Sequence, residues 1–273
     1  MATAGPAPET LTSAYQGDPA RYHRARAFPP GIAPRIVRQL LRALGRPARV
    51  LDVGAGTGRL AWPLAQVGVP TVALDLSPGM VAFLAARVRA ARPRPPLTVL
   101  QGDARHLPLA TGSLEAIVTV HMLHLLPDPV AALAEMRRVL QRRGWLAVGL
   151  QEHTADAPVG WAQRLWQAAL QRAGIPLPRA GWRTYARLEQ LVARVGGRVV
   201  QRLEAARWQV LVRPAEVWQG VRERRYSPYE GLSPVRHDVF SRRLSREFRR
   251  RFGDGQRPRA ERRVFAWYIV RFA

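Results

Sequence analysis

The chain contains no cysteine, and among its 273 residues there is also no lysine and no asparagine. Without cysteine the protein forms no disulfide, no cysteine-held iron–sulfur cluster and no cysteine zinc site, and it has no thiol nucleophile. Two kinds of chemistry are thereby excluded. One is radical chemistry on a cluster held by cysteines, and the other is any reaction through a covalent adduct between cysteine and a pyrimidine.

The missing lysine changes how the net charge of +24 is interpreted. Such a charge usually indicates a polyanionic partner. Here all 43 basic residues are arginine. Lysine and asparagine are encoded only by A-rich codons, so a GC-rich genome explains the composition without selection for nucleic-acid binding. We expect a solvated, arginine-biased surface, with a nucleic-acid partner as the less favoured alternative.

The chain also lacks a long apolar run, and none approaches the roughly 18 residues that cross a bilayer. Residues 1–10 have neither a basic start nor an apolar segment of the kind that directs secretion. We therefore expect a soluble, cytoplasmic protein. The length and the 47% hydrophobic content suit one enlarged α/β domain, or a core domain with a cap. The sequence does not predict an oligomeric state.

The central part of the chain alternates between short apolar strands and helices, which predicts a parallel sheet covered on both faces. The expected strands are 49–53, 71–74, 97–100, 116–120 and 145–150, and the expected helices are 33–44, 58–66, 77–91 and 128–142. Beyond residue 150 we expect helices at 161–173, 185–195, 214–224 and 235–252, and strands at 199–203, 208–212 and 264–272. Insertions at about 152–180 and 217–255 are predicted to form a helical cap. The expected division is a lead-in at 1–45, a core at 46–150 and a C-terminal half at 151–273.

A glycine-rich turn follows the first expected strand, in the segment Val50-Leu51-Asp52-Val53-Gly54-Ala55-Gly56-Thr57-Gly58. Glycines permit strained turns and let a ligand approach the backbone. A dinucleotide-binding fingerprint would have a further glycine at position 59, where this chain has Arg59. A diphosphate would also be repelled by Asp52, whereas an ammonium or sulfonium group would be attracted.

Two further acidic residues follow the second and third expected strands. Asp75 ends the second strand, 21 residues after Gly54, and can accept hydrogen bonds from both ribose hydroxyls of a nucleoside. Asp103, in Gly102-Asp103-Ala104, can accept from an adenine amino group. Both lie at carboxyl ends of parallel strands, where open α/β sheets bind ligands. The alternatives are that Asp75 caps a helix beside Ser77 and that Asp103 caps a turn.

With these motifs in their order, the segment Val50–Leu150 resembles the class I S-adenosylmethionine-dependent methyltransferases, specifically the type 11 group with its quinone-biosynthesis-like members. The resemblance implies a Rossmann-like, doubly wound sheet of seven mostly parallel strands with an antiparallel last strand, which 264–272 fits. It also implies S-adenosyl-L-methionine as cofactor and assigns residues to its parts. These are Asp52, Gly54, Ala55, Gly56 and Gly58 around the methionine part, Asp75 on the ribose, Leu76, Met80, Asp103 and Ala104 around the adenine, and His121 beside the reactive methyl group.

Histidines flank the carboxyl end of the fourth expected strand, where the methyl acceptor should lie. His121 or His124 could take a proton from the acceptor, since histidine suits that role near neutral pH. The alternative is that the two rings only line or pack the pocket. In the lead-in, Tyr22 and Arg26 resemble residues that fold over the cofactor in related enzymes, where they would touch its carboxylate. Methyl transfer of this kind needs no metal.

The acceptor is less well defined by the sequence. Methyltransferases of this fold that act on base amines carry Asn- or Asp-Pro-Pro-aromatic after the fourth strand, where this chain has His121-Met122-Leu123-His124. That departure favours O-, C- or N-methylation of a small molecule. The alternatives are an RNA or protein methyltransferase that docks through the arginines of 235–252, and a non-catalytic module that only binds the cofactor. The same helix could also lie on a membrane surface, although an ordinary cap helix is preferred.

Overall fold

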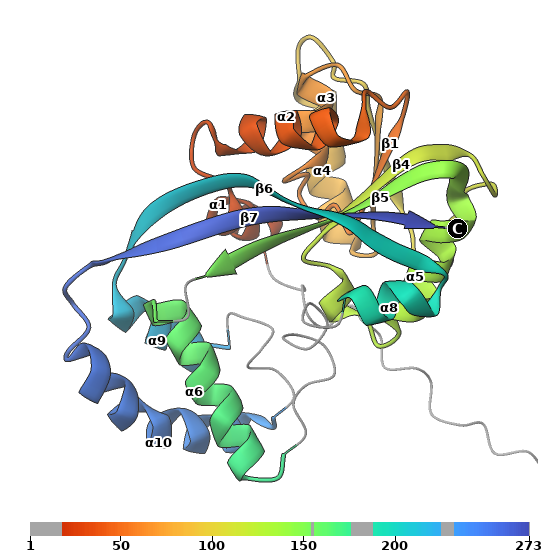
Figure 1. The fold of residues 1–273 in the computed structure, drawn as a ribbon. Coiled ribbons are helices and arrows are strands. Elements are labelled where there is room, and N and C mark those ends of the chain that lie inside the picture. Colours follow the sequence, from red (N-terminus) through yellow and green to blue (C-terminus); the bar gives the residue numbers. More distant parts are fainter. Residues whose placement is uncertain (1–17, 154–155, 176–187, 225–231, 273) are drawn as a thin grey trace, which may run out of the picture.

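The computed structural model describes residues 18–153, 156–175, 188–224 and 232–272. These residues form one sheet of seven strands in the order β3-β2-β1-β4-β5-β7-β6 (Figure 1). The strands are β1 (Val50–Val53), β2 (Thr71–Asp75), β3 (Leu97–Gln101), β4 (Leu114–Val120), β5 (Leu140–His153), β6 (Gly197–Val212) and β7 (Arg259–Phe272). Five of them come from the alternating central segment, as the sequence predicts.

The direction of the strands confirms the predicted fold class. Strands β1 to β5 pair in parallel with their neighbours. Among the described strands β7 alone is antiparallel, to β5 on one side and to β6 on the other. The central parallel strands β1 and β4 are buried on both sides, and neither has an exposed residue. This burial explains why these strands appear in the sequence as continuous apolar runs.

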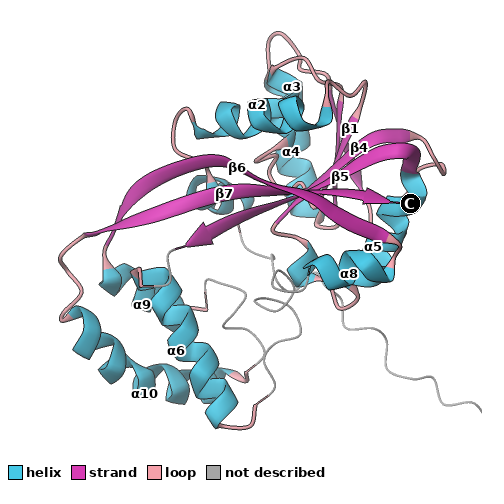
Figure 2. Ribbon diagram, in the orientation of Figure 1, coloured by secondary structure: helices cyan, strands magenta, loops and turns pink. Residues whose placement is uncertain are grey.

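Helices cover both faces of the sheet (Figure 2). One face packs against α2 (Ile32–Leu44), α3 (Ala61–Gln66) and α4 (Pro78–Ala90), and the other against α5 (Pro129–Val139) and α8 (Leu188–Arg194). Their starts follow local signals, because Ser77 and Asp128 accept hydrogen bonds from backbone N–H groups of α4 and α5 and a proline follows each. In α2 the predicted apolar face is the buried face.

Several expected element boundaries were wrong. The helix expected to reach residue 142 ends at Val139, and the strand expected from 145 begins at Leu140. Helix α3 begins at Ala61 rather than at residue 58, because Gly58 has a φ of +83° that no right-handed helix contains. The two short strands expected at 199–203 and 208–212 are one strand, β6, which keeps pairing with β7 through register shifts after Val199 and Glu204. A β-bulge of this kind absorbs an extra residue without ending the strand.

The C-terminal insertions form a helical lobe beside the sheet. It consists of α6 (Pro158–Arg172), α9 (Pro214–Arg222) and α10 (Pro234–Phe252), which lie together under the projecting ends of β6 and β7 (Figure 1). The three helices share an apolar core of their own, with Trp166, Trp218 and Phe248 at its centre. Residues 176–187 and 225–231 of the expected insertions lie outside the described residues, as does the start of the helix expected at 185–195.

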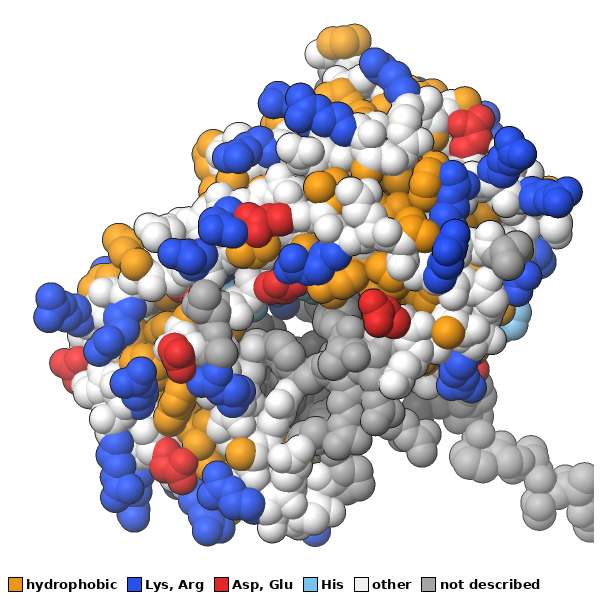
Figure 3. Space-filling model, viewed as in Figure 1, with side chains coloured by type: hydrophobic (Ala, Val, Ile, Leu, Met, Phe, Trp, Pro, Cys, Tyr) orange, Lys and Arg blue, Asp and Glu red, His pale blue; other side chains and the backbone are white. Residues whose placement is uncertain are grey.

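The arginines are widely distributed. On the face shown in Figure 3, basic side chains are spread over both the sheet domain and the helical lobe rather than gathered in one patch. This distribution agrees with an arginine-biased surface. Within the described ranges, no helix combines the length and the apolar content that crossing a membrane requires.

Candidate cofactor-binding site

The glycine-rich turn lies at the carboxyl end of β1 and is held against the end of β2. The backbone N–H groups of Gly54 and Ala55 both donate to the carbonyl oxygen of Leu74, at 2.8 and 3.0 Å. Gly54, Gly56 and Gly58 have φ angles of +73°, +55° and +83°. A residue with a side chain adopts such angles only at a cost, so the turn needs its glycines for backbone reasons alone.

The space around the three glycines differs, and the difference shows which one a ligand can approach. A Cβ atom at Gly54 would overlap the side chain of Met122, and one at Gly58 would lie 2.5 Å from Leu84. At Gly56 the nearest side-chain atom is a ring carbon of Tyr22, at 3.8 Å. Gly54 and Gly58 therefore allow close packing within the protein, whereas the space beside Gly56 has room for a ligand.

Asp52 is buried beneath the turn, with 2% of its surface exposed. Its Oδ2 accepts a hydrogen bond from the backbone N–H of Ala61, the first residue of α3, at 3.0 Å. Burial raises the pKa of Asp52 to about 7. The residue also borders a cavity of about 40 Å³ that it shares with Gly54, Gly56 and His121. Asp52 therefore anchors the start of α3. The attraction of its carboxylate for an ammonium or sulfonium group stays a prediction.

Asp75 connects the turn to the start of α4. Its Oδ2 accepts from the backbone N–H of Gly56 at 2.7 Å, and its Oδ1 accepts from the backbone N–H of Ser77 at 2.9 Å. Burial raises the pKa of Asp75, although the same hydrogen bonds oppose that shift. Ser77, not Asp75, is the N-cap of α4. A carboxylate has about four acceptor positions. Asp75 can therefore still accept hydrogen bonds from a ribose, and this contact stays a prediction.

Asp103 lies close to Asp75 because the N–H of Gly102 donates to the carbonyl oxygen of Asp75, at 3.0 Å. Its carboxylate accepts from the backbone N–H of Arg105 at 2.9 Å and pairs with that guanidinium at 2.6 Å. The hydrogen bond from Arg105 holds the pKa of Asp103 below its usual value. The turn-capping alternative is thus present in the structure, and the adenine contact stays a prediction. The other residues assigned to the adenine are Leu76, at the end of β2, and Met80 and Ala104, both buried.

His121 and His124 follow β4, and their rings lie edge to face with centroids 6.1 Å apart. His121 has a φ of +52°, unusual for a residue with a side chain, and its Nε2 accepts from the backbone N–H of Gln151 at 3.0 Å. Burial lowers the pKa of His121 well below its ordinary value and that of His124 to about 4. Both rings are therefore neutral at pH 7, and the base role predicted for one of them must work against these low pKa values.

The lead-in segment reaches the glycine turn, as the sequence predicts for Tyr22 and Arg26. Helix α1 (Pro19–Arg26) places the ring of Tyr22 over Gly56, and His23 Nδ1 lies 3.1 Å from Thr57 Oγ1. The charge of Arg26 contributes to the lowered pKa of both His121 and His124. The positions fit a contact with the carboxylate of the cofactor, which stays a prediction.

Several residues of this region were missed by the sequence analysis. The guanidinium of Arg59 lies 3.7 Å from the ring centroid of Phe28 and donates to Gln151 Oε1 at 2.9 Å, and burial lowers its pKa to about 10. Nearby, the buried carboxylate of Glu261 lies 2.7 Å from His153 Nδ1 and 3.1 Å from Arg263 Nε. Gln151 is 92 residues from Arg59 and Glu261 is 108 residues from His153, so no local pattern could have indicated these pairs.

Comparison with known proteins gives the class of this fold and site. The methyltransferase domain family matches residues 51–148, which contain the glycine turn, Asp75, Asp103 and both histidines. The chain is similar to a putative methyltransferase from Bacillus halodurans of known structure. The match covers 86% of this chain and 97% of the other, with a TM-score of 0.56 and 16% identity. At that identity the likeness concerns the fold alone.

Two relatives match at higher identity. An uncharacterized methyltransferase of Mycobacterium bovis is 36% identical over 156 residues, which are 57% of this chain and 58% of the relative. A demethylmenaquinone methyltransferase of Beutenbergia cavernae is 44% identical over 145 residues, 52% of this chain and 57% of the relative. The chain thus matches a little over half the length of these relatives. The resemblance drawn from the motifs is confirmed for residues 51–148, which match the methyltransferase domain family.

Proposed function

We propose that this protein transfers a methyl group from S-adenosylmethionine to a small-molecule acceptor. The observation that carries the proposal is the hydrogen bond from Gly56 to Asp75, because it joins the glycine turn to an acidic residue at the end of β2. A methionine group over the turn and a ribose at Asp75 would then lie at neighbouring strand ends. This is the edge of an open α/β sheet at which ligands bind.

The residues present fit that cofactor chemically. S-adenosylmethionine supplies a methyl group that is already activated on a positively charged sulfur atom. Asp52 provides negative charge beneath the turn, and Gly56 provides backbone without a side chain beside the cavity. Tyr22 covers the turn from α1 and would exclude water from the cofactor. The protein's task in such a displacement is to align the acceptor with the methyl group and to exclude water.

A small-molecule acceptor is supported by two observations. The demethylmenaquinone methyltransferase among the relatives is named for a small-molecule substrate. The segment after β4 is His121-Met122-Leu123-His124 and not the motif of base-amine methyltransferases. O-, C- and N-methylation all agree with these observations. An RNA or protein acceptor, and a module that binds the cofactor without transfer, are the alternatives that the experiments must distinguish.

Calorimetry tests the cofactor assignment. Wild-type protein and Asp75→Ala are titrated with S-adenosylhomocysteine and, separately, with a nicotinamide dinucleotide. We expect the wild type to bind only S-adenosylhomocysteine and the variant to bind it at least about tenfold more weakly, since a charge-assisted hydrogen bond contributes about 1.5–3 kcal/mol. Binding of the dinucleotide instead would disprove the cofactor. Equal affinity in the variant would disprove only the ribose contact.

Transfer is tested with radiolabelled S-adenosylmethionine and a panel of quinols, phenols and small amines. Labelled small-molecule product supports the proposal. Tight binding of S-adenosylhomocysteine with label in RNA or protein, and none in the panel, supports a macromolecular acceptor. Steep weakening of RNA binding with added salt would accompany the RNA case. Binding without transfer to any acceptor favours the non-catalytic module.

A further inference from the structure

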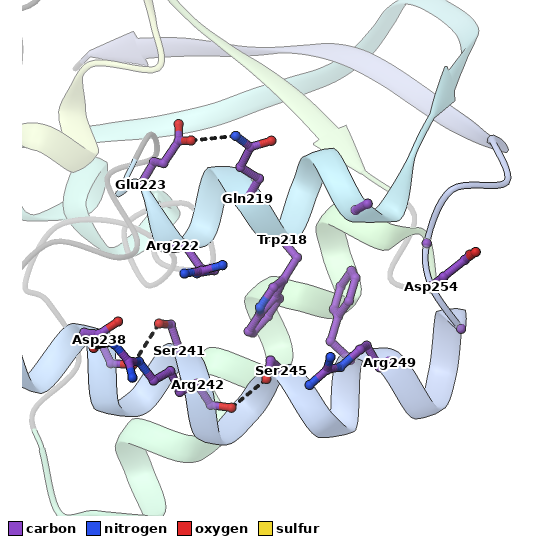
Figure 4. Close-up of a pocket in the computed structure, with 14 residues that line it drawn as sticks. Trp218, Gln219, Arg222, Glu223, Asp238, Ser241, Arg242, Ser245, Arg249 and Asp254 are labelled. Carbon is purple, nitrogen blue, oxygen red and sulfur yellow. Dashed lines mark hydrogen bonds and ion pairs between the residues drawn. The ribbon is translucent and has the colours of Figure 1, made fainter.

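A cavity formed by the described residues lies in the helical lobe, away from the glycine turn. It has a volume of about 940 Å³ and runs between α9 and α10 (Figure 4). None of the residues that line it borders the cavity at Asp52 and Gly56. Its size is that of a site for a small organic molecule, and neither the family match at residues 51–148 nor the proposed function assigns it a role.

Two helix faces form the walls of this groove. From α9 it is lined at three- and four-residue spacing by Ala215, Trp218, Gln219, Arg222 and Glu223, and from α10 by Asp238, Ser241, Arg242, Ser245, Phe248 and Arg249. Residues at this spacing share one face of a helix, so the groove follows the direction of both helices. The turn Gly253-Asp254-Gly255 borders it at the C-terminal end of α10. A Cβ at Gly255 would overlap the backbone of Ala215, and this glycine therefore lets the turn approach α9.

The floor of the groove is aromatic. The rings of Trp218 and Phe248 are stacked, with centroids 4.8 Å apart and an interplanar angle of 30°. Trp218 is only 9% exposed, and its buried Nε1 has no hydrogen-bond acceptor. Both rings are largely buried, Phe248 being 3% exposed, so only their edges border the groove. These edges give it an apolar part that suits an apolar or planar group of a ligand.

The charges around this floor are unevenly arranged. Figure 4 shows the guanidiniums of Arg222 and Arg249 extending from opposite helices into the space beside Trp218. Three carboxylates also border the groove. Glu223 accepts a hydrogen bond from Gln219 at 2.7 Å, and in Figure 4 the side chain of Asp254 extends away from Arg222 and Arg249. Asp238 pairs with Arg242 at 2.8 Å. Within the part of the chain that the structure describes, Arg222 and Arg249 have no acidic partner.

From this arrangement we propose that the groove binds a phosphate monoester whose organic part is apolar or aromatic. The guanidiniums of Arg222 and Arg249, which form no ion pair among the described residues, match the two negative charges of the monoester, and guanidinium groups bind phosphate oxygens through paired hydrogen bonds. The organic part contacts the exposed edges of Trp218 and Phe248. Because the volume far exceeds that of a phosphate ion, inorganic phosphate alone leaves the aromatic floor uncovered and binds more weakly than an aryl phosphate.

An arginine-rich chain places cations on many surfaces, so the site must be distinguished from general attraction of anions. Helix α10 itself offers the control. Arg243 and Arg246 are exposed on the same helix but do not line the groove. Arg222 and Arg249 are also exposed at the surface, so replacing either pair by glutamine removes two charges without disturbing the core. The two double variants have the same net charge.

The experiment is a calorimetric titration of the full-length protein with phenyl phosphate and with inorganic phosphate. We expect saturable binding of one phenyl phosphate, at least about tenfold weaker in Arg222→Gln/Arg249→Gln and within about twofold of wild type in Arg243→Gln/Arg246→Gln. Inorganic phosphate should bind more weakly than phenyl phosphate to the wild type. Thermal unfolding and circular dichroism establish that both double variants are folded.

The proposal is overturned if phenyl phosphate does not saturate a single site, or if the two double variants lose the same affinity. It is also overturned if an RNA oligonucleotide binds to the groove arginines while phenyl phosphate does not. A lipid headgroup and a soluble metabolite could both supply a phosphate monoester. Competition of phenyl phosphate with vesicles that contain phosphatidic acid, measured on the same variants, distinguishes these two sources.

Discussion

The backbone N–H of Gly56 donates a 2.7 Å hydrogen bond to the carboxylate of Asp75, a residue 19 positions further along the chain. The bond joins the turn after β1 to the end of β2, so the shape of the turn depends on an acidic side chain. We predict that the same carboxylate binds the ribose, which would couple cofactor binding to the stability of the turn.

Substitution of the first two glycines of the turn should separate stability from binding. Gly54→Ala places a methyl group against Met122 and should lower the free energy of unfolding by about 3 kcal/mol, because it combines an unfavourable φ with overpacking. Gly56→Ala meets only Tyr22, at 3.8 Å, and should cost about 1 kcal/mol of stability. Chemical denaturation measures both values.

The same two variants should rank in the opposite order for binding. Once corrected for unfolded protein, Gly54→Ala should keep most of its affinity for S-adenosylhomocysteine, whereas Gly56→Ala should lose at least about tenfold. The methyl group of Gly56→Ala stands on the side of the turn from which a ligand approaches. Wild-type affinity in Gly56→Ala would show that the methionine group does not lie over this residue.

The ionisation of Asp52 should make cofactor binding depend on pH. Its pKa is raised to about 7, and the ammonium and sulfonium groups of S-adenosylmethionine favour the ionised form. We expect the affinity for S-adenosylmethionine to rise between about pH 6 and pH 8 and then to level off. Calorimetry across this range measures the effect, and Asp52→Asn should abolish the rise. A pH profile that is identical in the variant would contradict the prediction.

Asp52 should also affect the stability of the unliganded protein. A carboxyl group with a raised pKa holds its proton in the folded state at a pH at which the unfolded chain has lost it. Stability from this group is therefore greatest below about pH 4 and decreases as the pH rises towards about 7. The shift from 3.8 to about 7 corresponds to roughly 4 kcal/mol. Denaturation midpoints of Asp52→Asn, compared with wild type across this window, should lack the decrease.

The histidines after β4 should not become protonated near neutral pH. Burial lowers the pKa of His121 well below its ordinary value and that of His124 to about 4. Their imidazole NMR signals should thus stay those of the neutral ring from pH 8 down to about pH 5, whereas in the urea-unfolded chain they should titrate near pH 6.5. If His121→Ala and His124→Ala both turn over an identified acceptor at nearly the wild-type rate, neither histidine is the base.

Glu261 should contribute to stability at neutral pH and lose that contribution in acid. Its pKa is lowered because His153 and Arg263 stabilise the charged form, although burial acts in the opposite direction. The stabilisation is present above the unfolded value of 4.5 and disappears as the pH falls through the lower, folded value. Glu261→Gln should lower the free energy of unfolding by about 3 kcal/mol at pH 7. The difference from wild type should shrink by pH 3.

Much of the fold was predictable because its signals are local. The helices α4 and α5 begin where Ser77-Pro78 and Asp128-Pro129 place a cap and a proline in adjacent positions. The alternation of apolar strands and helices predicted the parallel order. The sequence did not predict that β6 is one continuous strand, because its continuity depends on pairing with β7, some 60 residues further along the chain. Short irregularities in apolar pattern therefore suggested two strands where the sheet has one.

The site was predictable to a different extent. The positions of Asp75 and Asp103 followed from their place after parallel strands. Two other contacts could not be predicted in this way. Tyr22 covers Gly56, and Arg59 lies between Phe28 and Gln151. In the sequence Arg59 is notable only as a residue that replaces a glycine, because its partners come from segments that the tertiary fold alone brings together.

The sequence by itself determined the conformation of the glycine turn, because only glycine readily adopts positive φ at three alternate positions. The tertiary structure decided which side chain lies beside each of those glycines, since Met122, Tyr22 and Leu84 come from distant parts of the chain. It likewise brought Arg222 and Arg249 to one groove. Backbone preferences are local properties of residues, whereas side-chain partners depend on how helices and strands pack.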